Sequence, residues 1–235
     1  MQVLSKTDIG LSRSSNQDCV KSISCEDFCF SIVCDGIGGF SGGDIASKTA
    51  STVICNYFEH NKISDIKKML IDSFKIANEK IFEIGKNNIE INNLGTTAVA
   101  SLVDKSKNAY ICNVGDSRAY VISDSHIKQI TNDHSMVNEL LMSKKITAEE
   151  AKIFPNKNII TRALGFSNST PDFYSLKLNS NEKIFLCTDG LSNYLSTKEI
   201  LSIILNYDSR KSLNILIDRA KNLGGNDNIT VSLIF

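Results

Sequence analysis

Apolar residues change their spacing several times along the chain, and each spacing predicts a type of element. Short apolar runs bounded by polar or glycine-rich turns predict strands over 1–9, 19–24, 28–34, 96–103, 109–114, 119–123, 126–130, 159–163, 172–178, 183–187 and 229–235. Apolar residues three or four positions apart predict long helices over 44–60, 63–86, 196–206 and 209–222. Shorter helices are predicted over 135–143 and 147–153.

The order of these elements indicates the fold class. One pair of one-sided helices follows the first strands and a second pair precedes the last strand, so each pair is expected to cover a sheet. Short polar connections at 104–108 and 124–125 favour antiparallel hairpins over crossover units. The sequence contains no linker, repeat or low-complexity tract. We therefore predict one α+β domain over 1–235, with sheets inside and helices outside.

Composition and charge indicate which partners and which cell compartment are expected for the protein. Its 26 basic and 26 acidic residues cancel, so no general attraction to nucleic acid or an anionic membrane is expected. No apolar run approaches the roughly 18 residues of a membrane span, and the first residues do not form a signal peptide. Seven cysteines occur without a CxxC pair, which is typical of reduced thiols in a cytoplasmic protein. We expect a monomer.

Several predicted strands run into an aspartate, which is the main chemical signal in the chain. These aspartates are Asp35, Asp116, Asp189 and Asp227, and Asp18 follows a polar turn in a similar way. One such aspartate is usually only a turn residue. If the sheets bring the five together, however, their carboxylates could not stay ionised side by side without cations. Carboxylates, a backbone carbonyl and water suit Mg²⁺ or Mn²⁺, whereas no His/Cys spacing favours zinc.

The surroundings of Asp35 and Arg13 suggest what such cations could do. The residues after Asp35, 36–43, are rich in glycine, which lets a ligand approach the backbone closely. Taken alone, this segment also fits a strand-to-helix turn with a capping aspartate. Two cations about 3.5–4 Å apart can support in-line displacement at phosphorus. The planar guanidinium of Arg13 could hold a phosphate through two hydrogen bonds.

Eight short motifs resemble, in the same order, those of the metal-dependent protein phosphatase family, the type 2C serine/threonine phosphatases in their compact bacterial form. The motifs are RSSNQD at 13–18, DGIGG at 35–39, GTT at 95–97, VGDSRAY at 114–120, TNDHS at 131–135, TRALG at 161–165, TDGL at 188–191 and GNDNIT at 225–230. Each motif is weak by itself, but together they cover nearly the whole chain, from about 7 to 231. The resemblance implies a four-layer αββα sandwich of two antiparallel sheets flanked by helix pairs.

The resemblance also implies roles for individual residues. The implied ligands of a two-metal Mn²⁺ or Mg²⁺ centre are Asp18, Asp35, Asp189, Asp227 and the carbonyl of Gly36. Asp116 would join Asp189 in holding a third, weaker ion. Arg13 would bind the substrate phosphate, and it completes the implied catalytic set with the first four aspartates. A segment at about 135–158 corresponds to the flap beside the family's active site, where substrate selection is expected.

Three positions vary from the pattern of many family members. Gln17 stands where eukaryotic members have glutamate, and Ile37 stands where they have a histidine thought to protonate the leaving group. An isoleucine cannot donate a proton, so the proton would come from water. His134 is a second candidate for this acid, although a histidine after a strand is usually structural. Asn193 occupies a position that is frequently acidic.

The function implied is a protein phosphatase that hydrolyses phosphoserine and phosphothreonine by attack of a water bridging two metal ions. Its substrates would be phosphorylated proteins, and a bacterial serine/threonine kinase would be its counterpart. Two alternatives remain at this point. One is a catalytically silent binding or sensing module with the same fold, and the other is a phosphatase acting on partner-switching regulators of transcription.

Overall fold

A computed structural model describes residues 1–37, 42–87, 94–155 and 159–235 of the chain. The glycine-rich motif residues 38–41 and the end of the predicted flap, 156–158, lie outside the described residues. In the described part, eleven strands form two sheets in which all neighbours pair antiparallel. The first sheet has the order β1 (Val3–Asp8), β11 (Ile229–Ile234), β10 (Lys183–Cys187), β7 (Arg118–Ile122) and β8 (Ile127–Gln129).

The second sheet faces the first. Its order is β2 (Asp18–Ser24), β3 (Phe28–Ile37), β5 (Ala98–Asp104), β6 (Asn108–Val114) and β9 (Asp172–Lys177), and the short β4 (Gly95–Thr96) pairs with the end of β3. The connections at 104–108 and 124–125 form antiparallel hairpins, as predicted.

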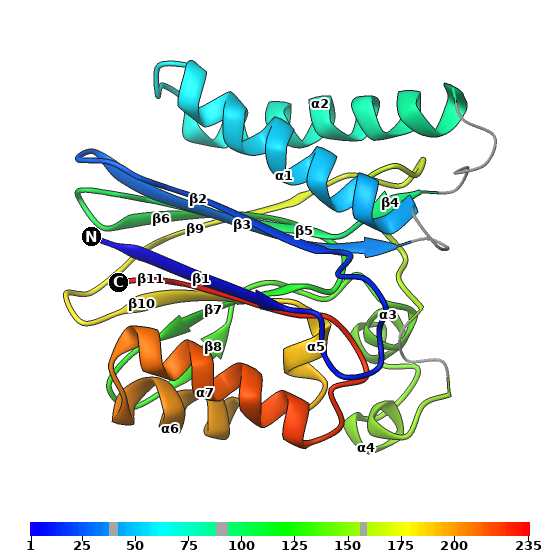
Figure 1. The fold of residues 1–235 in the computed structure, drawn as a ribbon, viewed down its shortest axis with the longest axis vertical. Helices are drawn as coiled ribbons and strands as arrows, with labels where there is room; N and C mark the ends of the chain where they lie inside the picture. Colours follow the sequence, from blue (N-terminus) through cyan, green and yellow to red (C-terminus); the bar gives the residue numbers. More distant parts are fainter. Residues whose placement is uncertain (38–41, 88–93, 156–158) are drawn as a thin grey trace.

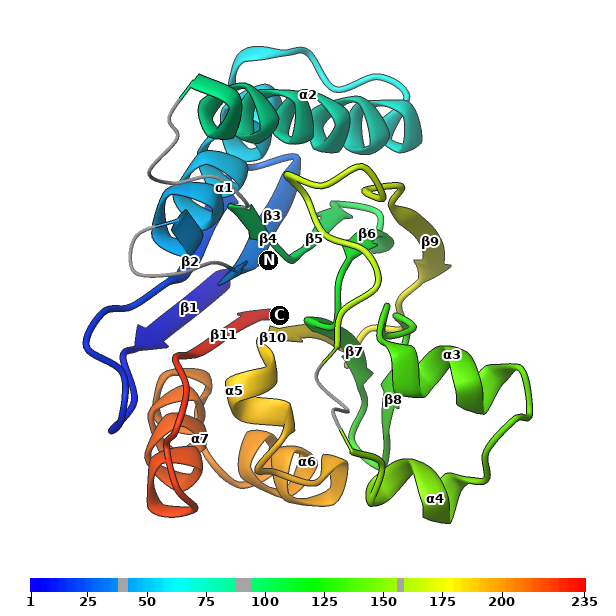
Figure 2. The same ribbon diagram turned by 90° about the vertical axis from the view of Figure 1, so that its right-hand side faces the viewer.

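Two helix pairs cover the outer faces of the sandwich, as Figure 1 shows. Helices α1 (Gly42–His60) and α2 (Ile66–Asn87) lie on the second sheet, and α6 (Thr197–Asn206) and α7 (Ser209–Asn222) lie on the first. The predicted αββα sandwich is therefore confirmed. Three short helices, α3 (Met136–Met142), α4 (Ala148–Lys152) and α5 (Asp189–Ser192), lie at one end of the sandwich, onto which Figure 2 looks.

The apolar core is divided into three layers, and β3 contributes to two of them. Ile32 and Cys34 pack under α1 and α2, whereas Val33 packs between the two sheets. Successive side chains of a strand point to opposite faces. Asp35 therefore continues the alternation on the side of Val33 and points into the space between the sheets.

Small polar side chains join the sheets at the margin formed by β1 and β2. Four serine hydroxyls make a closed ring of hydrogen bonds: Ser31 to Ser232 at 2.7 Å, Ser232 to Ser5 at 2.9 Å, Ser5 to Ser22 at 2.9 Å and Ser22 to Ser31 at 3.0 Å. Each hydroxyl can donate one bond and accept another, so the buried Ser31 and Ser232 are satisfied without water.

Two details of the predicted strands are wrong. The segment 159–163 is not a strand, because its bridge Ser135–Ile160 is isolated and Thr161 N donates instead to His134 O. In β3, the predicted end at Cys34 is too early. Pairing of Gly36 with Thr96 extends the strand to Ile37, so Asp35 lies within the strand rather than after it.

Candidate active site

Asp18 and Asp35 lie directly opposite each other on neighbouring strands. They are register partners in the β2–β3 pair. Gly36 N donates to Gln17 O at 3.1 Å, so the interstrand bond lies at this position, although Gln17 N donates instead to Asn228 Oδ1 at 2.7 Å. The adjoining Asp18–Asp35 pair is then of the non-hydrogen-bonded type, in which Cα atoms are only about 4.5 Å apart and side chains are closest. Partners in a register share a face, so both carboxylates point between the sheets.

Two further aspartates reach the same end from the first sheet. Asp189 is the first residue of α5, directly after β10, and Asp227 lies just before β11, the neighbour of β10. The two sheets are tied together here by Thr188, whose Oγ1 donates to Asp18 Oδ2 at 2.9 Å. The same hydroxyl accepts from Thr230 N at 3.0 Å. Aspartates that are far apart in sequence thus meet where both sheets end.

Burial and mutual repulsion make these carboxylates reluctant to ionise. Burial raises the pKa of Asp18 to about 7, and the charges of Asp189 and Asp227 add to this effect. Burial also raises the pKa of Asp35 well above its usual range, with Asp18 the strongest of its charged neighbours. For Asp189, burial and then the charge of Asp227 raise the pKa. A nearby cation would reverse these effects, because it favours the ionised form.

Unpartnered oxygens provide an independent test of whether a cation fits. Oδ1 of Asp18, of Asp116 and of Asp189 is buried and has no hydrogen-bond partner. A buried polar atom without a partner is costly, and a carboxylate oxygen is the ligand that Mg²⁺ and Mn²⁺ prefer. Among the described residues, no three His, Cys, Asp or Glu side chains lie close enough to enclose one ion. The unpartnered oxygens, rather than a preformed cage of three side chains, are therefore the feature that fits a cation.

Gly36 occupies a position that no other residue could take. A Cβ there would lie 2.2 Å from Gly43 O and 2.7 Å from Gln17 O. The start of α1 therefore packs directly on the backbone beside Asp35. This close packing explains part of the glycine-rich signal in the sequence, while the predicted role of the Gly36 carbonyl as a ligand stays a prediction.

Arg13 lies at the mouth of the carboxylate cluster. Its Nη2 donates to Asp227 Oδ2 at 2.9 Å, and 52% of its side chain is exposed. The hydrogen bond to Asp227 raises the pKa of Arg13, and the charges of Asp35 and Asp189 contribute as well. The guanidinium is thus fixed beside the carboxylates yet open to an incoming anion.

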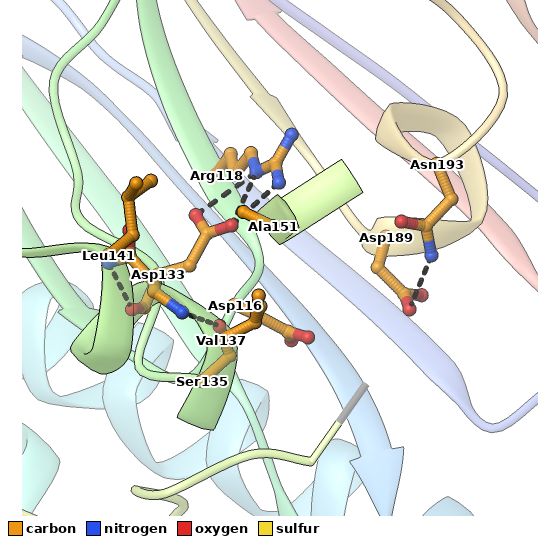
Figure 3. Close-up of a pocket in the computed structure, with 10 residues that line it drawn as sticks. Asp116, Arg118, Asp133, Ser135, Val137, Leu141, Ala151, Asp189 and Asn193 are labelled. Atoms are coloured by element: carbon orange, nitrogen blue, oxygen red, sulfur yellow. Dashed lines mark hydrogen bonds and ion pairs between the residues drawn. The ribbon is translucent and has the colours of Figure 1, made fainter. Parts of the chain in front are cut away.

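Asp116 and Asp189 both line a pocket of about 340 Å³ beside the carboxylate cluster. Figure 3 shows the Asp116 carboxylate pointing across this space towards Asp189, which accepts a hydrogen bond from Asn193 at 3.0 Å. Burial raises the pKa of Asp116 to about 7, and the charge of Asp189 contributes next. Residues of α3 and α4, including Leu141 and Ala151, form another wall of the pocket.

An ion pair that the sequence did not single out also lines this pocket. Arg118 Nε donates to both carboxylate oxygens of Asp133 at 3.0 Å, and its Nη2 donates to Oδ2 at 2.6 Å. Gln129 Nε2 donates to Asp133 Oδ1 at 2.8 Å. Arg118 lies in the VGDSRAY motif and Asp133 in the TNDHS motif. Their pairing depends on the β7–β8 hairpin and could not be deduced from spacing along the chain.

His134 does not serve as a free acid. Its Nδ1 accepts a hydrogen bond from Gly115 N at 3.1 Å, and its Nε2 lies 3.2 Å from Asp172 Oδ2. Burial lowers the pKa of His134, which favours the neutral ring. Because both ring nitrogens face protein groups, the alternative of His134 as the leaving-group acid finds no support here.

The sequence matches the family described as Protein phosphatase 2C over residues 11–229. The chain belongs to the protein phosphatase 2C family. It is 34% identical over 241 residues to protein phosphatase PhpP of Streptococcus pneumoniae, covering 100% of this chain and 97% of that protein. The resemblance inferred from eight motifs is thereby confirmed, and so is the prediction of a phosphatase enzyme.

Solved structures of other phosphatases agree with this family assignment. The serine/threonine phosphatase of S. agalactiae matches with a TM-score of 0.92 and 33% sequence identity, covering 100% of this chain and 98% of the other. The catalytic domain of the serine/threonine protein phosphatase PstP in complex with two manganese ions matches with a TM-score of 0.87 and 27% identity, covering 99% and 96%. In the described part of this phosphatase, no helix is both long and apolar enough to cross a membrane.

Proposed function

We propose that this 2C-type phosphatase removes phosphate from phosphoserine and phosphothreonine in proteins, using water that bridges two Mn²⁺ or Mg²⁺ ions. The observation that carries the proposal is the crowding of carboxylates from both sheets, with buried Oδ1 atoms of Asp18 and Asp189 left without partners. The names of the S. agalactiae and PstP phosphatases support the same substrate class.

The chain's own residues divide the work. We assign Asp18, Asp35, Asp189 and Asp227, with the Gly36 carbonyl, to holding the two ions, and Asp116 with Asp189 to holding a weaker third ion. When bound, such ions lower the pKa of a shared water and neutralise charge on the phosphoryl oxygens. Arg13 binds and orients the substrate phosphate through its exposed guanidinium.

The proton for the leaving group is assigned to water. Ile37 ends β3 next to the carboxylates and has no proton to give. The Nδ1 of His134 accepts from Gly115 N, and its buried Nε2 faces Asp172. A leaving serine or threonine alkoxide would therefore be protonated by solvent or by water held at the site.

The proposal extends to the domain organisation, the cell compartment and the oligomeric state of the enzyme. We assign residues 1–235 to one catalytic domain, with a flap at about 135–158 that borders the pocket beside Asp116. All seven cysteines are free thiols, which suits the cytoplasm, where a bacterial serine/threonine kinase would supply the substrates. A monomer is the proposed active form.

The first experiment compares hydrolysis of para-nitrophenyl phosphate and of a phosphothreonine peptide in EDTA, Mg²⁺ and Mn²⁺. Metal-dependent release of phosphate from both substrates, lost in Asp35→Asn, is the expected result. Release that persists in EDTA would contradict the metal centre. Metal binding without any release would contradict the phosphatase activity and favour a silent binding module.

A further inference from the structure

His134 makes two hydrogen bonds to one residue, Gly115. Gly115 N donates to the ring Nδ1 at 3.1 Å, and His134 N donates to Gly115 O at 3.0 Å. The side chain is buried, with 4% of the residue exposed. Gly115 immediately precedes Asp116, so this double contact fixes the backbone from which the Asp116 carboxylate projects.

The ring of His134 is itself held in one orientation. Because Nδ1 accepts a hydrogen bond, the neutral ring carries its proton on Nε2, which lies 3.2 Å from Asp172 Oδ2. Asp172 is held in turn by Arg162 Nη1 at 3.0 Å and by the Tyr174 hydroxyl at 3.2 Å. The bond at Nδ1 therefore sets the tautomer, while Nε2 lies within ion-pair distance of Asp172 without a hydrogen bond to it.

The loop at Gly115 needs such support. Its φ of +104° lies in a region that side chains rarely adopt, and a Cβ there would lie 2.6 Å from Thr97 Cβ. On the Thr97 side, Thr97 Oγ1 and Ser117 Oγ are 2.7 Å apart and hydrogen-bonded. The Asp116 loop is therefore held by Thr97 on one side and by His134 on the other.

The same histidine contacts both ends of the predicted flap. His134 O accepts from Thr161 N at 2.8 Å, and two residues later Met136 N donates to Ile159 O at 2.9 Å. The Thr161 hydroxyl also donates to Glu139 Oε1 at 2.6 Å. His134 thus contacts the base of the flap through its main chain and the Asp116 loop through both its main chain and its ring.

We propose that His134 is a positioning residue for the weak cation site at Asp116: its Nδ1 fixes Gly115 so that the Asp116 carboxylate faces Asp189. The inference rests on the proposed role of Asp116, but it concerns a residue that touches neither cation nor substrate. It predicts that affinity for the weak ion depends on the acceptor at Nδ1 rather than on the bulk of the ring.

Two substitutions separate the effect of the acceptor at Nδ1 from the effect of the bulk of the ring. In His134→Asn, the side-chain oxygen lies near the former Nδ1 and can still accept from Gly115 N. In His134→Gln, the longer amide reaches the Asp172 end and leaves Gly115 N without its acceptor. Mn²⁺ binding to the full chain is measured by isothermal titration calorimetry, which resolves tight from weak binding, and Asp116→Ala identifies the weak event.

The expected result is a loss of weak-site affinity of about tenfold or more in His134→Gln, with tight binding retained. His134→Asn should bind the weak ion nearly as the unsubstituted protein does. Equal weak-site affinity in His134→Gln and the unsubstituted protein would overturn the inference, and so would an equal loss in both variants. Weak binding that survives Asp116→Ala would overturn it as well.

Two further measurements complete the test. Turnover of para-nitrophenyl phosphate by the unsubstituted protein in Mn²⁺ reports the proposed function separately, so a failure there is distinguishable from a failure at His134. If His134→Gln does not fold, His134→Ala removes the same Nδ1 acceptor without adding a longer side chain. It should weaken only the weak site, and an unchanged weak site would overturn the inference.

Discussion

The hydroxyl of Thr188 donates a hydrogen bond to Oδ2 of Asp18 at 2.9 Å and thereby joins the end of β10 to the start of β2, across the sandwich. Thr188 is fully buried, and its oxygen also accepts from Thr230 N at 3.0 Å. One side chain outside the predicted ligand set thus orients a predicted ligand. Thr188 lies in the TDGL motif, in which the sequence pattern indicated only the adjacent Asp189 as a site residue.

Thr188→Val should destabilise the protein. The substitution keeps the shape but leaves Asp18 Oδ2 and Thr230 N without partners, which should lower the free energy of unfolding by about 1–3 kcal/mol. Urea unfolding in EDTA measures this, with Thr188→Ser as the matched control that keeps the hydroxyl. Equal stability of the valine and serine variants would show that the bond contributes nothing.

Asp35→Asn and Asp189→Asn should each remove most turnover without unfolding the protein. Loss of a ligand charge is expected to cost at least about 3 kcal/mol of transition-state stabilisation, or roughly 100-fold in kcat/KM. Turnover of a phosphothreonine peptide in saturating Mn²⁺ is the measurement. Asp218→Asn, on the exposed side of α7, is the control and should be unaffected. Near-normal rates in both site variants would refute the assignment of these ligands.

The metal-free protein should lose stability as the pH rises towards neutrality. The pKa of Asp18 is 3.8 when it is unperturbed and about 7 in the fold, so the folded state binds the extra proton between these values. The stability that this proton gives is complete below the unfolded pKa and is lost as the pH rises through the folded one. The slope for one proton is at most about 1.4 kcal/mol per pH unit.

Urea unfolding in EDTA between pH 5 and 8 tests this, and Asp18→Asn should flatten the dependence. In excess Mn²⁺ the trend should reverse, because the ion must displace the proton and binds more tightly as the pH rises. A metal-free protein whose stability rises steadily over this range, with the same slope in Asp18→Asn, would contradict the buried protonated carboxylate.

Arg13→Ala should act mainly on substrate binding. The guanidinium is half exposed and fixed by Asp227, so its loss removes hydrogen bonds to a charged phosphate worth about 1.5–3 kcal/mol, or roughly tenfold or more in KM. Steady-state kinetics on a phosphothreonine peptide separate KM from kcat. Arg13→Lys keeps the charge without the planar guanidinium, so its KM should lie between the KM of Arg13→Ala and that of the unsubstituted protein. A fall in kcat at unchanged KM would place Arg13 outside the binding step.

Local sequence determined the elements and the family. Apolar spacing depends only on which face of a helix or strand is buried, so both helix pairs and most strands were predicted close to their observed bounds, β10 and α7 among them. The order of eight motifs was sufficient to predict the family that the comparisons confirm. Four of the aspartates were found because each follows a predicted strand beside a glycine or asparagine, and Asp18 because it follows a polar turn.

Tertiary structure decided how those residues meet. Pairing with β4 extends β3 past Asp35, and the alternation of the strand then points that carboxylate between the sheets. The bond from Thr188 to Asp18 and the double contact of His134 with Gly115 join segments distant in sequence. Such contacts depend on sheet order and register, which are set by packing over the whole domain. Residue spacing along the chain contains no record of them.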